Sequence, residues 1–356
     1  MNIRPAFSSN GAIVGFTVLV VFFLILPIAL GYAGYPKKEH IYTTVPTRMG
    51  PFSFFHKVIF EEKGDIDVLI LGASLSWAGV DATIIKEALS KQLGREAVVY
   101  NFGSNWRGEN LYYTLLRDLT EHRRVKLLLY NPPMPYQKIN EPHQKSQFWT
   151  IYGDDDAHRD LSLYRRAQVY AFEMIGAPRN LVSLLRKDLT SDSEDMGSLL
   201  GTRKVYASRS GLFIKKDMQP PTFTDEQLLY GKATAVNYQF TGDALLDFQA
   251  VYNHKLFDLA RSQAISIATI HLPLYRYRHE KTIGERANWA EVMNNPNIAM
   301  IGVPNSVLFA GLNEADLDNF YYDDHMNVNG AAFYTKAILP GILALYAKVQ
   351  HPGAGR

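Results

Sequence analysis

Short apolar runs alternate with longer amphipathic stretches over much of this chain. The run IDVLIL at 66–71 is followed by similar runs at 97–100, 125–130, 265–270 and 299–301. Such runs, when turn residues bound them, are typical of strands buried on both faces of a sheet. Helical periodicity occurs at 81–93, 109–121, 244–263, 285–294 and 330–348. Asp81 is a candidate N-cap for the first of these helices, and Gly94 marks its end.

Strands that alternate with helices at this spacing predict right-handed βαβ units and a parallel sheet. We therefore expect an α/β fold, a flavodoxin-like three-layer sandwich around a five-stranded parallel sheet. The alternation stops between about 132 and 243, where the pattern predicts one helix at 161–175 and a flexible polar piece near 190–200. This stretch is too long for a structureless loop, so we interpret 132–243 as an inserted cap within a domain at 65–349.

The N-terminal segment has a different pattern, because no charged side chain occurs between Arg4 and Lys37. Nineteen residues at 12–30 are apolar enough to span roughly 28 Å as a helix, about one hydrocarbon core. We expect a tail at 1–10, a transmembrane anchor at 11–34 and a membrane-proximal stem at 35–64, where three prolines break any regular element. The alternative is a cleaved signal peptide, although its apolar region is usually shorter. Basic residues on both sides leave the orientation open.

Composition narrows the class of protein further. Apolar residues make up 47% of the chain and charged residues 20%, which is typical of a globular protein. The net charge of +2 is too small for a protein that neutralises many phosphates, so we expect no nucleic-acid partner. The chain has no cysteine, which excludes disulfides, Cys-ligated metals and thiol nucleophiles.

Candidate chemistry follows the predicted strands at the points where they end. The first strand is followed by Gly72-Ala73-Ser74, the second by Asn101-Phe102-Gly103 and the third by Asn131, while Asp323-Asp324-His325 precedes the last helix. Sites in open α/β sheets form at the carboxyl ends of the strands. A hydroxyl, an imidazole, carboxylates and turn glycines at one edge are the set that nucleophilic acyl chemistry requires.

These blocks resemble those of the SGNH hydrolases, also called GDSL-like. That family carries a Ser in a Gly-Asp-Ser-like turn after the first strand, a Gly after the second, an Asn after the third and a late Asp-x-x-His. In this chain Ala73 replaces the Asp of the first block, and Tyr322 stands where the family keeps the acid three residues before His325.

The resemblance implies that Ser74 is the nucleophile, with Ser76 as its nearest rival, and that His325 is the base. An acid would come from Asp323 or Asp324. We slightly prefer Asp323, because alternate residues of an extended segment share a face. Backbone or side-chain N–H groups of Ser74, Gly103 and Asn131 would bind the oxyanion. A metal held by the two aspartates and His325 lacks a second His group at ligand spacing, so we expect no metal and no cofactor.

The layout of an anchor followed by this domain resembles that of accessory acyltransferases of bacterial envelope polymers. That resemblance implies a single-pass inner-membrane protein with a periplasmic catalytic domain. It would transfer an acyl group, most simply acetyl, to an envelope polysaccharide or teichoic-acid-like acceptor, beside a multi-spanning membrane-bound O-acyltransferase. Two alternatives remain open, an envelope carbohydrate esterase and an inert binding or scaffold module.

Overall fold

The computed structural model describes residues 9–33, 50–105, 108–131, 205–230, 247–281 and 299–350, with isolated positions at 39, 42, 163–164, 238–239 and 283–284. The helices expected at 161–175 and 285–294, the flexible piece near 190–200 and most of the proposed cap therefore lie outside the described residues.

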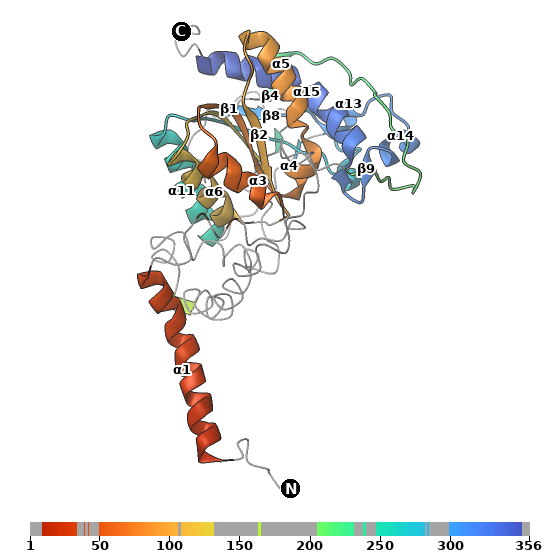
Figure 1. The fold of residues 1–356 in the computed structure, drawn as a ribbon. Coiled ribbons are helices and arrows are strands. Elements are labelled where there is room, and N and C mark those ends of the chain that lie inside the picture. The colour runs from red at the N-terminus through yellow and green to blue at the C-terminus, as the bar shows by residue number, and fades with distance from the viewer. Residues whose placement is uncertain are drawn as a thin grey trace, which may run out of the picture.

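The core of the fold is a six-stranded sheet with the strand order β2-β1-β3-β6-β8-β4 (Figure 1). Five strands run parallel, as expected: β1 (Ile66–Gly72), β2 (Val99–Gly103), β3 (Val125–Tyr130), β6 (Ser266–Ile270) and β8 (Ala299–Ile301). The short β4 (Leu229–Tyr230), which the sequence did not predict, adds an antiparallel edge strand beside β8. It comes from the region interpreted as an insertion.

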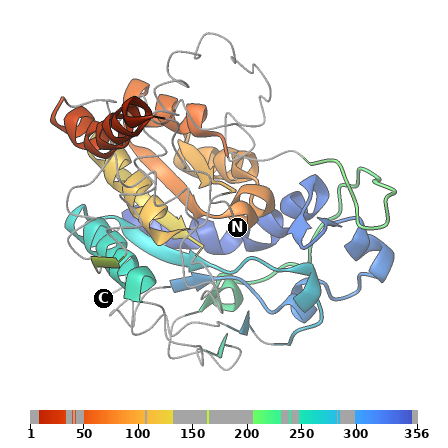
Figure 2. The same ribbon diagram turned by 90° about the horizontal axis from the view of Figure 1, so that it is seen from below.

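Alternating side chains of the strands point into two separate hydrophobic clusters. In β1, Leu69 and Leu71 join α6 (Glu109–Thr120) and α11 (Asp247–Ser262) in one cluster. Val68 and Ile70 join α5 (Ala82–Leu93) and α15 (Val328–Gln350) in the other. Figures 1 and 2 place α6 and α11 on one side of the sheet and α15 on the other.

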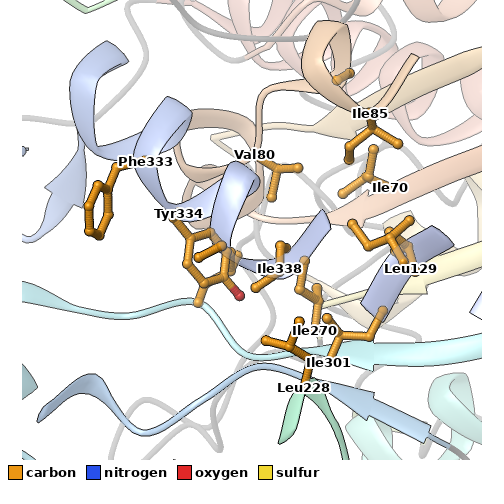
Figure 3. Packing of buried hydrophobic residues seen from close by; sticks show 14 of the residues in the cluster. Ile70, Val80, Ile85, Leu129, Leu228, Ile270, Ile301, Phe333, Tyr334 and Ile338 are labelled. Atoms are coloured by element: carbon orange, nitrogen blue, oxygen red, sulfur yellow. The ribbon is translucent and has the colours of Figure 1, made fainter. Parts of the chain in front are cut away.

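The second cluster shows how α15 holds the sheet. Tyr334 and Ile338 of this helix lie beside Ile270 of β6 and Ile301 of β8 (Figure 3), and all four side chains are buried. Burying each such side chain contributes roughly 1.5–3 kcal/mol to folding. The helix that begins three residues after His325 is therefore fixed to the strands whose ends form the candidate site.

Residues 52–61 contradict the expectation that prolines keep the whole stem irregular. Pro51 precedes a helix, α3 (Phe52–His56), which continues as the π-helix η2 (Lys57–Glu61). Phe55 is fully buried and packs on Phe102 of β2, with the ring centroids 4.4 Å apart. Proline lacks an N–H group that the first turn of a helix does not need, so it starts this helix instead of breaking it. The folded domain thus begins near residue 50.

One residue of the earlier stem also belongs to the domain. Tyr42 is buried, and its hydroxyl donates to Oδ2 of Asp118 in α6 at 2.8 Å. Burial and the neighbouring carboxylate raise the pKa of Tyr42 well above its ordinary value, so the phenol stays protonated. This contact ties the segment before α3 to the same face of the sheet.

The N-terminal helix α1 (Asn10–Tyr32) stands apart from the sheet in Figure 1. It exposes large apolar side chains along its length, including Ile13, Phe16, Leu19, Phe22 and Ile25. Among the described helices, α15 alone is long and apolar enough to cross a membrane by length and composition, and more than half of it is buried in the domain. The apolar stretch Asn10–Leu26 of α1 is shorter. The anchor at 11–34 therefore stays a prediction.

The remaining elements are small. They are α4 (Ser74–Gly79), α10 (Asp225–Leu228), β5 (Tyr238–Gln239), η6 (Tyr275–Tyr277), β7 (Ile283–Gly284), α13 (Asn305–Leu308), α14 (Glu314–Asp318), β9 (Tyr321–Tyr322) and β10 (His325–Met326). Strands β9 and β10 form a hairpin, and β5 pairs with β7.

Candidate functional site

Ser74 lies just after the carboxyl end of β1, between β2 and β3 in the sheet. Strand β1 ends at Gly72, Ala73 is extended, and Ser74 is the first residue of helix α4. A Cβ at Gly72 would come within 2.2 Å of the Ser76 hydroxyl oxygen, so only glycine lets the chain turn this tightly. The turn leaves Ser74 half-buried at the edge of the sheet.

Gly103 has a related packing role on the neighbouring strand. It pairs in register with Gly72, and a Cβ at this position would lie 2.3 Å from the backbone nitrogen of Trp77 in α4. Two glycines at adjacent strand ends therefore let α4 approach the sheet closely. This packing fixes the direction in which Ser74 leaves the sheet.

Asn101 of β2 holds α4 against the sheet through two hydrogen bonds, a role that the sequence did not indicate. Its buried side-chain amide donates to the carbonyl oxygens of Ser76 at 2.8 Å and Val80 at 3.1 Å. The Ser76 carbonyl also accepts from the Val80 N–H at 3.3 Å, and the Val80 carbonyl lies at the C-cap of α4, where the backbone has no further helical donor. An asparagine inside a predicted strand end was the available signal.

His325 is presented by the hairpin of β9 and β10. Tyr321 and Met326 form one cross-strand pair and are buried in the core, whereas Tyr322 and His325 form the next pair and are half-buried. Cross-strand partners point to the same face of a hairpin, and successive pairs point to opposite faces. The buried pair thus anchors the hairpin while the other pair projects toward α4.

The segment after the hairpin is fixed as well. Oδ1 of Asn327 accepts from the N–H groups of Asn329 at 2.9 Å and Gly330 at 3.2 Å, which makes Asn327 the N-cap of α15. Its Nδ2 donates to the carbonyls of Ala207 and Asn319. His325 is therefore two residues from a well-anchored helix start.

The structure brings the two principal candidates into contact. Oγ of Ser74 and Nε2 of His325 are 2.8 Å apart, although the residues are separated by 251 positions. This is ordinary hydrogen-bonding distance for a hydroxyl and an imidazole, and it is the spacing that a nucleophile and its base require. Both side chains are half-buried, so a substrate can reach them.

Ser76, the rival nucleophile, lies in a different environment. Its side chain is fully buried beneath the turn, and its hydroxyl has no hydrogen-bond partner among the described residues. A buried hydroxyl without a base cannot attack an external ester. The structure favours Ser74 over Ser76.

The two aspartates do not lie where the sequence placed them. Asp323 and Asp324 form the tight turn between β9 and β10, with Asp323 at a φ of +55°. The premise that Asp323 and His325 share a face of an extended segment is therefore wrong. The chain reverses between them, and Asp is one of the few non-glycine residues that tolerates this φ.

Both aspartates have other contacts. The Asp324 carboxylate forms an ion pair with Arg276, and the carbonyl of Asp323 accepts from Nη1 of Arg209 at 2.7 Å. Within the described part of the chain, neither carboxylate is hydrogen-bonded to His325. A role for either one as the orienting acid stays a prediction.

Tyr322, which replaces the family's acid, contacts the histidine directly. Its ring stacks on the imidazole of His325 with the centroids 5.6 Å apart and the planes 22° from parallel. The hairpin pairs the two residues, so this stack follows from the strand register. The sequence showed only that an acid was missing there.

The candidate oxyanion donors differ in how they are already bonded. The Gly103 N–H donates to Oδ1 of Asn101 at 2.9 Å, so an oxyanion would have to share it or displace that bond. Nδ2 of Asn131 donates one hydrogen to the Ile270 carbonyl at 3.1 Å and carries a second. The Ser74 N–H lies in the first turn of α4, where N–H groups have no intrahelical acceptor.

A second histidine lies at this edge of the sheet, where the sequence analysis had not placed one. His271 follows β6, and its Nε2 lies 3.1 Å from Oδ1 of Asn305. Burial lowers the pKa of His271 to about 4, and the hydrogen bond to Asn305 offsets only part of that shift. It is therefore neutral at pH 7. Among the described residues, no group of three His, Asp or Glu side chains is arranged to hold a metal ion.

Comparisons with known proteins add no relative: no family model matches this chain, and no curated protein is significantly similar to it. The functional argument therefore depends on the geometry described above.

Proposed function

We propose that this protein is a membrane-anchored acyltransferase of the SGNH type, with Ser74 as nucleophile and His325 as base. The observation that carries the proposal is the 2.8 Å contact between Ser74 Oγ and His325 Nε2. It supports the assignment because the fold brings together two residues that are 251 positions apart in the chain. The same proposal takes the α/β domain to be a flavodoxin-like three-layer sandwich.

The first step forms an ester on Ser74. The Ser74 hydroxyl gives its proton to Nε2 of His325 as Oγ attacks the acyl carbonyl of the donor, so the imidazole must carry its other proton on Nδ1. The tetrahedral intermediate collapses, the bond to the donor's leaving oxygen breaks, and that oxygen takes the proton from His325. The products are an acyl-serine, the donor alcohol and a neutral histidine.

The second step transfers the acyl group. A hydroxyl of the acceptor loses its proton to His325 and attacks the acyl-serine carbonyl, and Ser74 leaves with that proton. Water in place of the acceptor gives hydrolysis by the same path. Both steps build negative charge on the carbonyl oxygen, and we assign the Ser74 N–H and the second hydrogen of the Asn131 amide to bind it.

The location and partners are part of the proposal. We take α1 as a single-pass signal anchor in the inner membrane, with the domain on the periplasmic side. Its exposed apolar side chains support this placement, because a helix with such a surface needs an apolar surrounding. The donor would be a multi-spanning membrane-bound O-acyltransferase, and the acceptor an envelope polysaccharide or teichoic-acid-like polymer. An anchor favours transfer, since it keeps the acyl-enzyme beside a donor in the membrane.

The test uses the full chain in detergent micelles, with 4-nitrophenyl acetate as donor and a cello-oligosaccharide as acceptor. We expect Ser74→Ala to reduce nitrophenol release at least 10³-fold. The matched control is Ser76→Ala, which removes a hydroxyl two residues away in the same helix and should leave the rate within twofold. Comparable rates in wild type and Ser74→Ala would remove the assignment of the nucleophile.

The products separate the alternatives. Acetylated oligosaccharide, detected by mass spectrometry, supports transfer. Free acetate alone assigns the protein as an esterase, which the half-exposed Ser74 favours as the second candidate because water can reach it. A folded wild-type protein that releases no nitrophenol would instead be a binding or scaffold module.

A further inference from the structure

Several groups of the described residues lie near the imidazole of His325. Ser74 approaches from α4 and Tyr322 from β9, while the turn contributes Asp323 and Asp324. Two arginines hold that turn from outside: Arg209 binds the Asp323 carbonyl, and Arg276 pairs with the Asp324 carboxylate. Of these groups, the ones in direct contact with the ring are Ser74 and Tyr322.

A base that takes the Ser74 proton becomes an imidazolium and must be stabilised in that form. In a triad a buried carboxylate does this. The face of an aromatic ring carries negative charge and attracts a cation within about 6 Å of its centroid. The stack of Tyr322 on His325 falls within that distance, at 5.6 Å.

We infer that Tyr322 is a positioning residue that holds the His325 ring and stabilises its charged form through its aromatic face. The inference rests on the proposed function, since it concerns the same base. The residue at the position of the family's acid thus contacts the base directly.

The strand pairing explains why position 322 can take either role. It is the cross-strand partner of His325, so any side chain there lies on the same face as the imidazole. Residues 323 and 324 form the turn and cannot occupy that face. A carboxylate three residues before the histidine and a ring at the same position both approach the imidazole.

The experiment measures the pH dependence of the rate at which a fluorophosphonate probe labels Ser74 in the full chain. Loss of the aromatic face makes the imidazolium less stable, so Tyr322→Leu should move the midpoint of the ascending limb down by about half a pH unit. A weaker base also accepts the proton less readily, so the plateau rate should fall about threefold or more. A purely structural role of the ring would lower the rate without moving the midpoint.

Two further variants keep the test decisive. Tyr322→Phe retains the ring face and should reproduce the wild-type midpoint. Tyr322→Asp restores a carboxylate at this position and should raise the midpoint of the ascending limb. This variant replaces Tyr322→Leu in the test if the Leu variant does not fold. A Leu midpoint equal to wild type, a Phe variant that behaves as the Leu variant, or an Asp variant without an upward shift overturns the inference. So does a thousandfold loss of labelling in Asp323→Asn or Asp324→Asn.

Failure of the proposed function gives a different result. Folded wild-type protein that is not labelled at Ser74 removes the nucleophile itself, whereas labelling with an unchanged midpoint in Tyr322→Leu removes only the role of the ring.

Discussion

The two ends of the central sheet both gather polar side chains, but they hold them differently. At the amino end, Asp67 of β1 is 1% exposed and accepts hydrogen bonds from four partners: Arg95, Lys126, the Tyr346 hydroxyl and the Val98 N–H. Burial alone would raise the pKa of this carboxyl, but the hydrogen bonds from these four partners hold it well below its usual value.

At the carboxyl end, the polar groups are half-buried and share fewer partners. Ser74 and His325 contact each other, and Asn131 commits one of its two amide hydrogens to the protein. This end is fixed by its glycines, by Asn101 and by the buried face of the β9–β10 hairpin, none of which uses the reactive atoms.

This difference between the two ends separates polar residues that stabilise the fold from polar residues that can react. A carboxylate with all its lone pairs satisfied contributes to stability and has nothing left for a substrate. Polar groups that keep an unused hydrogen-bond donor or acceptor at a rigid edge of the sheet are available to bind a substrate or react with it. Substitutions at the amino end should therefore change stability, and substitutions at the carboxyl end should change reactivity.

The largest effect is expected at the base. His325→Ala should lower the rate of fluorophosphonate labelling about 10³-fold, equivalent to about 4 kcal/mol of activation free energy, because Ser74 loses its proton acceptor. The free energy of unfolding in urea should change by less than about 0.5 kcal/mol. His254→Ala, on the exposed surface of α11, is the control and should label at the wild-type rate. A large loss of stability in His325→Ala would contradict the prediction that substitutions at the carboxyl end change reactivity and leave stability unchanged.

The amino end should show the reverse. Asp67→Asn should lower the free energy of unfolding by about 3 kcal/mol, the lower limit for breaking a buried ion pair, because Arg95 and Lys126 can still reach solvent. The folded variant should label at the wild-type rate. Asp65→Asn, two residues earlier and exposed, is the matched control. Equal urea midpoints for the two variants would contradict the account of this network.

The two ends should also lose stability in different pH ranges. The folded-state pKa of His271 is about 4 against an ordinary value of 6.5, so the unfolded chain takes up the proton first. Stability should therefore fall by up to about 3 kcal/mol as pH decreases from about 6.5 to 4. The pKa of Asp67 is depressed, so its contribution is present above about pH 4 and is lost below it.

Urea unfolding at a series of pH values checks this separation. His271→Gln should flatten the curve between pH 6.5 and 4 only, and Asp67→Asn should flatten it below pH 4 only. If either variant changes the other range, the assignment of the two ranges is wrong.

The smallest effect is expected at Tyr346, and it tests whether several groups together hold the Asp67 carboxylate. Tyr346→Phe removes one of the five hydrogen bonds to Asp67, at an O···O distance of 2.5 Å, and leaves the ion pairs. We expect a loss of about 1 kcal/mol in urea unfolding. A loss as large as that of Asp67→Asn would show that the hydroxyl, not the ion pairs, holds the carboxylate.

The sequence predicted the features that depend on local signals. The five parallel strands follow from short apolar runs, and α5 has the expected Asp81 N-cap, whose carboxylate accepts from the Thr83 N–H, and Gly94 in the left-handed region. Ser74 and His325 could be selected because strand ends of a parallel sheet converge, whatever their separation in the chain.

The parts that could not be predicted depend on contacts distant in sequence. Strand β2 continues through Asn101 to Gly103, since the Asn101 side chain bonds to α4 and does not open a turn. The Asp323-Asp324 turn contains no glycine, so nothing local marked a hairpin there. The stack on Tyr322 exists only because that hairpin sets the register.

The most direct test of the central claim is the site of covalent modification. The full chain is treated with a fluorophosphonate probe, digested and sequenced by mass spectrometry. We expect one adduct, on the peptide that contains Ser74 and at that residue, and no adduct in Ser74→Ala. A folded wild-type protein without an adduct, or an adduct at Ser76 or elsewhere that persists in Ser74→Ala, would contradict the assignment of Ser74 and His325 as nucleophile and base.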